Sequence, residues 1–204
     1  MNAREAYARL LRLGVPVLRT ADAAAALEQS TAAASMTLSR LVESGLVKPV
    51  RHGTWWVAGE VDPYRLPEYL TAPLPSYLSL HTALHLRGLN EQIPEVIYAV
   101  SLARTQRIKT RAGTFSIHHV APDVFGGFEE TPAGVKLATA EKALFDFAYL
   151  SPARSRLFAA LPELELPRGF RRAELRRWVR RIPSDRARTI TEQRLDAFLA
   201  RAGG

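Results

Sequence analysis

Cysteine is absent from this 204-residue chain, which excludes disulfide bonds, thiolate metal sites and a thiol nucleophile. Long apolar runs are absent too, because no stretch reaches the roughly eighteen consecutive apolar residues of a membrane-spanning helix. The opening MNAREAYARLLRLG is charged and amphipathic, without the apolar centre of a signal peptide. We therefore expect a cytoplasmic protein with no membrane partner.

The residue patterns of common catalytic sites are also missing. There is no Gly-rich phosphate loop, no Gly-x-Ser-x-Gly turn and no convincing nuclease-like acidic pair. His81 and His85 share a helix face, but Thr82 stands where the zinc motif needs glutamate. His118 and His119 are neighbours in an expected strand and point to opposite faces. We expect no metal site, no cofactor and no enzyme activity.

Residues 30–57 predict a helix followed by a two-stranded hairpin. Ser30 suits the N-cap, apolar residues recur at helical spacing, and Gly45 ends the helix in a left-handed conformation. Runs rich in Val and Trp then flank His52-Gly53, which is a hairpin signal. A helix with a basic hairpin directly after it is typical of a winged helix-turn-helix DNA-binding domain.

The face of this helix opposite its apolar stripe is small and polar, which suits insertion into a DNA major groove. The alternative is an ordinary hydrophobic corner of an α+β domain. The candidate DNA contacts are Thr31, Ser35, Met36, Ser39 and Arg40 on the helix, and Lys48, Arg51 and His52 on the hairpin.

Two further helices are expected before this one, at residues 4–13 and 21–29, with Thr20 capping the second. The very short turn between the second and third helices predicts the helix-turn-helix unit. Four prolines between residues 59 and 75 then indicate a connector. We place a winged helix-turn-helix domain at residues 1–60 and a second domain at residues 61–204.

The second domain is predicted to be α+β, with a mostly antiparallel sheet and flanking helices. We expect a helix capped by Ser79, a hairpin around Ala112-Gly113 and a helix opened by Thr139. In that last helix Glu141 and Asp146 point in different directions and make a poor acid–base pair. Glu141 is expected to interact with the N-terminus of its own helix, and Asp146 to make a local polar contact.

The formal net charge of +8 is concentrated near the C-terminus. Lys and Arg outnumber Asp and Glu by 7 to 5 in residues 1–60 and by 13 to 6 in residues 151–204, whereas residues 61–150 have 8 against 9. An amphipathic helix near residue 175 carries much of this charge, on Arg172, Arg176, Arg177, Arg180 and Arg181. These arginines are expected to form a solvated face, a secondary nucleic-acid contact or a contact with an acidic protein partner.

Three stretches in this order resemble the AbiEi family, the antitoxin and autorepressor half of type IV toxin–antitoxin pairs. They are the segment ending in GLVKPVRHGTWWVAG, then YLSLHTALHLRGLNEQIP with IYAVSLARTQRIKTRAGTFSIHHV, then GVKLATAEKALFDFAYL. The resemblance extends from about residue 5 to residue 150 and rests on packing residues rather than on catalytic ones.

The resemblance implies a transcriptional autorepressor that binds double-stranded operator DNA, expected to contain inverted repeats, and an antitoxin that counteracts a nucleotidyltransferase-like toxin without a stable complex. The family also includes solitary transcription regulators with no toxin partner. A protein-interaction adaptor, in which the second domain is the functional surface, is the alternative from another class.

Overall fold

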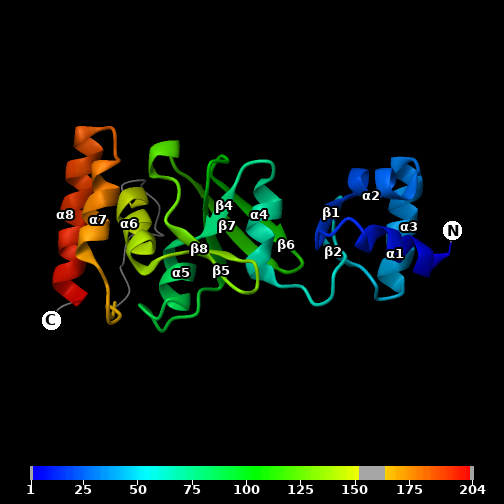
Figure 1. Cartoon of the computed structure of the whole chain (residues 1–204), viewed down its shortest axis with the longest axis horizontal. Coiled ribbons are helices and arrows are strands. Elements are labelled where there is room, and N and C mark those ends of the chain that lie inside the picture. The colour runs from blue at the N-terminus through cyan, green and yellow to red at the C-terminus, as the bar shows by residue number, and fades with distance from the viewer. Residues whose placement is uncertain (1, 152–163, 203–204) are drawn as a thin grey trace. The chain divides into compact units, whose positions relative to one another are not determined.

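The computed structural model describes residues 2–151 and 164–202 of the chain (Figure 1). It divides into two compact units, Met1–Leu66 with Lys109–Gly113, and Pro67–Ile108 with Thr114–Gly204. The predicted α+β class is confirmed, since helices accompany both a three-stranded and a six-stranded sheet.

The first unit contains three helices and a small sheet, and each expected helix and strand is present. Its elements are α1 Ala3–Leu11, β1 Val17–Arg19, α2 Thr20–Leu27, α3 Thr31–Glu43, β2 Lys48–Arg51 and β3 Thr54–Trp56. The strands are ordered β1-β3-β2 with antiparallel pairing, and the register pairs Val17 with Trp56 and Lys48 with Trp56. The sheet therefore links the segment before α2 to the hairpin after α3.

One apolar cluster holds the three helices of this unit together. Leu10 of α1, Leu27 of α2, and Leu38 and Leu41 of α3 are buried in it. Burying a leucine side chain contributes about 1.5–3 kcal/mol to stability. These contacts therefore stabilise helices that are too short to be stable on their own. The expectation that Thr20 caps α2 is wrong, because Arg19 occupies the N-cap position and Thr20 is the first helical residue.

The second unit alternates short strands with helices. After η1 Pro63–Arg65, its elements are α4 Leu66–Thr71, β4 Ser76–Leu78, α5 Leu80–Leu86, β5 Val96–Ser101, β6 Gln106–Thr110, β7 Gly113–His119, η2 Pro122–Val124, β8 Phe128–Glu130, β9 Lys136–Ala138, α6 Ala140–Leu150, α7 Arg172–Arg180 and α8 Asp185–Ala202. The predicted hairpin around Ala112-Gly113 and the helix opened by Thr139 are confirmed.

The sheet of this unit is mixed, with the strand order β6-β7-β5-β4-β9-β8. β4 runs antiparallel to β5, and β8 runs antiparallel to β9. β5 runs parallel to β7 and β4 parallel to β9, so the sheet contains more parallel pairing than its hairpins alone indicated. The parallel pairs arise because β6 and β8 are edge strands. From β6 the chain turns back to place β7 beside β5, and from β8 it turns back to place β9 beside β4.

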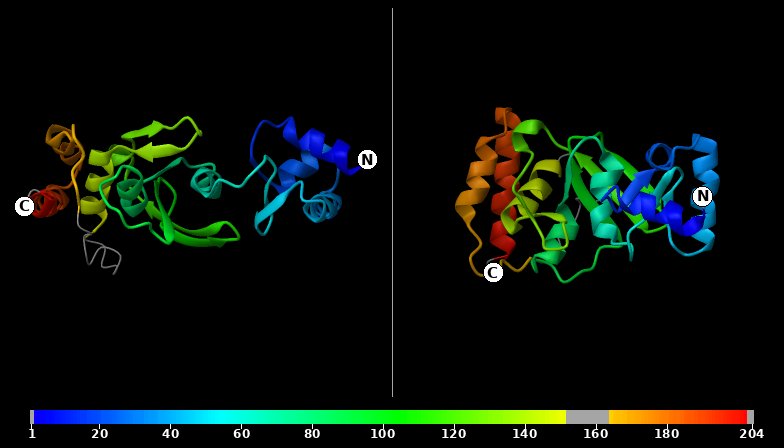
Figure 2. Two further views of the ribbon diagram at one scale, coloured as in Figure 1. Left: turned by 90° about the horizontal axis from the view of Figure 1, so that it is seen from below. Right: turned by 45° about the vertical axis from the view of Figure 1, so that its right-hand side comes forward.

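Helix α6 is the central helix of this unit. α7 and α8 pack against it side by side, and α5 packs on it from the sheet (Figures 1 and 2). Every residue from Glu141 to Ala148 is buried, so this part of the helix has no solvated polar face. A helix buried on all sides must bury its polar residues as well, and these need partners inside the core.

Candidate nucleic-acid interface

Helix α3 has well-defined ends and is tied to α2. The Ser30 hydroxyl accepts a hydrogen bond from the Ala33 N–H at 3.2 Å, as the sequence predicted for an N-cap. Gly45 has a φ of 71° just after the helix, which is also as predicted. The Thr37 hydroxyl donates to the Gln29 side chain at 3.1 Å and so links α3 to the end of α2.

The side of α3 opposite its buried stripe is open to solvent. Thr31, Ser39 and Arg40 are exposed and Ser35 is half-buried. Met36 is 61% exposed, which is unusual for a large apolar side chain. Arg40 forms no ion pair with any residue that the structure describes. This face therefore offers small side chains and one free cation, as contact with base edges in a major groove requires.

The β2–β3 hairpin carries the other three predicted contacts. Gly53 at its turn has a φ of 69°, a conformation that glycine adopts without strain. His52 is exposed and Arg51 is half-buried. The Lys48 Nζ lies 3.9 Å from the Glu60 Oε1, so the positive charge of Lys48 is partly balanced. Of the two hairpin cations, Arg51 is the one that remains uncompensated among the described residues.

A hydrogen bond that the sequence did not predict joins the hairpin to the start of α2. The indole Nε1 of Trp55 donates to the Thr20 hydroxyl at 2.9 Å, and the Thr20 N–H donates to the Gly53 carbonyl at 3.1 Å. Thr20 therefore contacts the hairpin through both its backbone and its side chain. Trp55 is half-buried and packs against the apolar cluster of this unit while Trp56 is buried, so the sequence near the hairpin contained no signal for this bond.

A hollow lies between the start of α3 and the hairpin, and we call it the wing hollow. Its walls are Thr20, Thr31, Ala32, Ser35, Pro49, Arg51, His52, Gly53, Trp55 and Arg111. Four of the eight predicted DNA contacts thus come together here, namely Thr31, Ser35, Arg51 and His52. The other four, Met36, Ser39, Arg40 and Lys48, lie outside the hollow.

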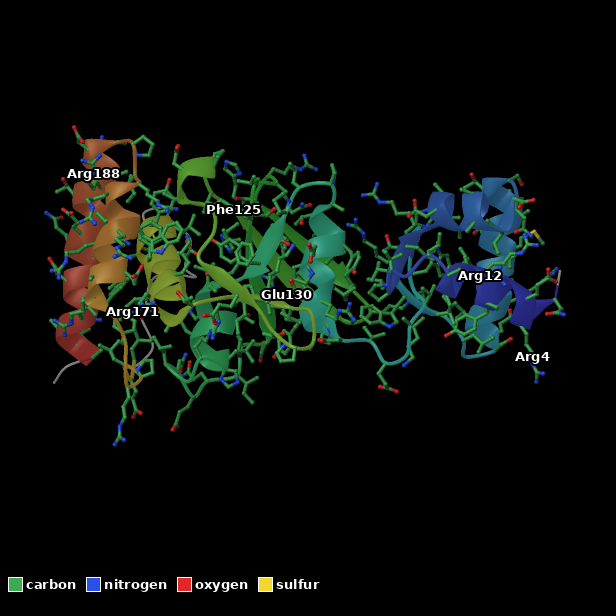
Figure 3. The ribbon with its side chains drawn as sticks, viewed as in Figure 1. Arg4, Arg12, Phe125, Glu130, Arg171 and Arg188 are labelled. Carbon is green, nitrogen blue, oxygen red and sulfur yellow. The ribbon has the colours of Figure 1, made fainter. Side chains whose placement is uncertain are left out.

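The five arginines predicted on α7 are all exposed, as expected for the outer face of an amphipathic helix. Figure 3 shows the side chain of Arg171 near one end of the α7–α8 pair and that of Arg188 near the other. Glu174 pairs with Arg177 at 2.8 Å and with Arg171 at 3.9 Å. No ion pair forms within the described residues for Arg172, Arg176 and Arg180, which we call the α7 arginine row.

The second unit also contains a buried polar cluster that sequence reasoning missed. Lys142 and Asp146 are fully buried one turn apart on α6, and the lysine Nζ donates to the Asp146 carboxylate and, at 2.8 Å, to the Val124 carbonyl. The other Asp146 oxygen accepts from Ser79 Oγ at 2.7 Å and from Tyr77 OH at 3.1 Å. The predicted local contact of Asp146 is thus a four-residue network.

This network changes two other predictions. Ser79 holds the N-cap position of α5, but its hydroxyl donates to Asp146 and does not cap the helix. Glu141 accepts from the backbone N–H of Arg171 at 2.8 Å, so it does interact with a helix N-terminus, but that of α7.

Burial dominates the titration of the network. It raises the pKa of Asp146 and lowers the pKa of Lys142, and in each case the partner's opposite charge opposes the shift. Burial, followed by the Asp146 charge, raises the pKa of Tyr77 well above its ordinary value. Because the four side chains are sealed in the core, no substrate reaches them in this conformation, and we assign the cluster a structural role.

The histidines are packed rather than joined as ligands. Burial lowers the pKa of His81, whose ring lies 5.0 Å from Phe147 and 5.1 Å from Tyr98. Burial, and then His81, lower the pKa of His118 to about 4. Within residues 2–151 and 164–202, no group of three or more potential metal-ligating side chains occurs.

Comparison with known proteins assigns no family to the chain. A scan against protein-family models gives no match, and a search of curated protein sequences finds no significant similarity. Among the described helices, none is both long and apolar enough to cross a membrane.

Proposed function

We propose that this protein is a DNA-binding transcriptional repressor in which the first unit acts as a winged helix-turn-helix. α3 enters the major groove, and the β2–β3 hairpin lies along the flanking phosphate backbone. The observation that carries the proposal is the exposed face of α3, where small side chains surround an arginine without a carboxylate partner among the described residues.

The order of elements supports this proposal. Two helices joined by the short turn at Glu28 to Ser30, followed by an antiparallel hairpin, form the arrangement in which the second helix presents its N-terminal part to DNA. Glu28 adopts a left-handed φ of 55°, which gives the sharp reversal between α2 and α3. The exposed positions of α3 then extend from Thr31 to Glu43, its last residue, and include Arg40.

The resemblance to AbiEi proteins extends the proposal to autorepression and to the antitoxin role. In that role the protein counteracts a nucleotidyltransferase-like toxin. An adjacent reading frame for such a toxin, and rescue of cell growth when the two proteins are co-expressed, are the results that this extension expects. Absence of the reading frame favours a solitary regulator, and rescue by a variant that cannot bind DNA assigns antitoxicity to the second unit.

The experiment that tests DNA recognition starts from random DNA, because it needs no knowledge of the operator. Full-length protein is used to select binders from a library of random duplexes and, in parallel, is footprinted on the DNA upstream of its own gene. We expect both to converge on one motif with two-fold symmetry. A library without enrichment, together with no footprint at low salt, contradicts the proposal and favours a protein-interaction adaptor.

A further inference from the structure

We propose that the wing hollow is an anion site that holds one phosphate of the DNA backbone, and that Thr20 is one of its hydrogen-bond donors. This inference rests on the proposed function, since it names the group that this part of the first unit recognises. It adds Thr20, which neither the sequence pattern nor the helix-turn-helix arrangement indicated.

The walls of the wing hollow combine hydroxyl groups with basic side chains. Three hydroxyls, from Thr20, Thr31 and Ser35, line the hollow together with the guanidinium groups of Arg51 and Arg111 and the imidazole of His52. Within the part of the chain that the structure describes, the walls contain no carboxylate. Hydroxyls, guanidinium and imidazole are the side chains that hold phosphate oxygens in protein–DNA complexes. A surface of this composition attracts an anion and offers nothing to a cation.

Several hydrogen-bond donors of the hollow have no acceptor among the described residues. Thr31 and Ser35 donate to no other described residue, and Arg51 forms neither an ion pair nor a side-chain hydrogen bond with one. Such donors are hydrated in the free protein, and phosphate oxygens can replace that water with charge-assisted hydrogen bonds. The hollow thus has several donors that a single phosphate group could satisfy together.

Two hydrogen bonds hold Thr20 in position beside the hollow. Its oxygen accepts from the Trp55 indole at 2.9 Å, and its backbone N–H is held by the Gly53 carbonyl. The oxygen is therefore fixed in position, while its own hydrogen is given to no described residue. A hydroxyl held by an N–H donor and bordering an anion-attracting hollow is pre-organised to donate to a phosphate oxygen.

A pair of substitutions separates direct contact from positioning. Thr20→Val removes the hydroxyl and also the bond to Trp55, whereas Trp55→Phe removes the bond and reduces the aromatic wall of the hollow but leaves the hydroxyl. Full-length variants are titrated with a random-sequence 24-base-pair duplex, about two helical turns, by fluorescence anisotropy across a salt series. We expect Thr20→Val to weaken binding about tenfold and Trp55→Phe to weaken it about threefold or less. Thr20→Ser, which keeps the hydroxyl, should bind almost as the wild type does.

The salt dependence gives a second readout. Threonine carries no charge, so Thr20→Val should lower affinity at every salt concentration without changing the slope of log K against log salt. Arg51→Ala should reduce that slope by about 1. Equal losses for Thr20→Val and Trp55→Phe, or no loss for Thr20→Val, overturn the assignment of Thr20. If Thr20→Val fails to fold, Thr20→Ala is measured against Thr20→Ser by the same criteria.

The same variants distinguish a backbone phosphate from a free anion. Inorganic phosphate is titrated at constant ionic strength while tryptophan fluorescence is recorded. We expect no saturable change below about 10 mM, because the Arg51 and Arg111 guanidinium groups border open solvent and hold a mobile anion weakly in water. A saturable millimolar site that Thr20→Val abolishes assigns the hollow to a free anion and overturns the DNA assignment. Failure of the proposed function is different, since wild-type protein then binds no duplex at any salt concentration.

Discussion

Removing the negative charge of Asp146 while keeping the shape of its side chain is expected to destabilise the second unit strongly. Asp146→Asn leaves the Lys142 ammonium in the core with neutral oxygen acceptors alone, namely the Val124 carbonyl and the amide oxygen of the substituted side chain, and with no carboxylate partner among the described residues. Breaking one partner of a buried ion pair typically costs about 3–5 kcal/mol. The lysine can avoid this cost by losing its proton, which at pH 7 requires about 5 kcal/mol from the ordinary pKa of 10.5. We therefore expect a loss of about 3–5 kcal/mol at pH 7.

The sign of the pH dependence follows from the same reasoning. If Lys142 is neutral in folded Asp146→Asn, the unfolded state binds one more proton than the folded state at any pH below 10.5. The stability of this variant then rises with pH, and its deficit relative to the wild type shrinks by up to about 1.4 kcal/mol per pH unit between pH 7 and 9. A deficit that grows over this range contradicts a neutral buried lysine.

The measurement is urea unfolding followed by tryptophan fluorescence. Trp55→Phe and Trp56→Phe, both in the first unit, provide a background in which Trp178 alone reports on the second unit. Trp178 is a suitable reporter because its ring centroid lies 4.5 Å from Lys142 Nζ. The decisive variant adds Lys142→Met to Asp146→Asn, and this double variant should be more stable than Asp146→Asn alone. A double variant that is less stable than the single one refutes the view that an unpaired charge causes the loss.

The remaining predictions concern DNA binding. Arg40→Ala should lose about 1–3 kcal/mol on the selected site and less on random DNA, as measured by competition titrations, and equal losses would place Arg40 on the backbone instead of a base. Lys48→Ala should change the salt slope less than Arg51→Ala, because Glu60 already lies close to Lys48, and the reverse order would show that this pair opens on DNA. Substituting the α7 arginine row with glutamine should leave the melting temperature almost unchanged. Duplex binding at low salt should weaken if the row contacts nucleic acid and should stay the same if the row is a solvated face. The matched control is Arg177→Gln, because Glu174 already forms an ion pair with Arg177.

Local signals in the sequence were sufficient for most of the fold. Ser30, Gly45 and Gly53 act through hydrogen bonds or backbone angles within a few residues of themselves, so their roles could be assigned from their neighbours. The exposed face of α3 followed from helical periodicity in the same way.

Contacts between distant residues could not be predicted in this way. Trp55 and Thr20 are 35 positions apart, and Asp146 and Ser79 are 67 apart, so no spacing rule connects them. The burial of α6 from Glu141 to Ala148 depends on α5, α7 and α8 packing around it, and the charged residues within its sequence gave no sign of this. A buried Lys142 also runs against the general preference of lysine for the surface, which is why a charged pair at helical spacing was not recognised as a core element.

The α7 arginines and the buried network are connected through Trp178. Two cations lie over its ring, Lys142 Nζ at 4.5 Å and the Arg181 guanidinium at 4.4 Å from the centroid, and Gly127 packs so closely that an added Cβ would lie 2.5 Å from the indole. The inner side of α7 is thus fixed by packing and by cation–π attraction, which contributes about 0.5–2 kcal/mol for each cation. The α7 arginine row takes no part in these contacts, and like charges spaced four apart oppose helix formation by about 0.2–0.5 kcal/mol per pair. Because the row slightly opposes folding while Trp178 and its neighbours hold the helix in place, its charge is available to bind an anionic partner without loss of the fold.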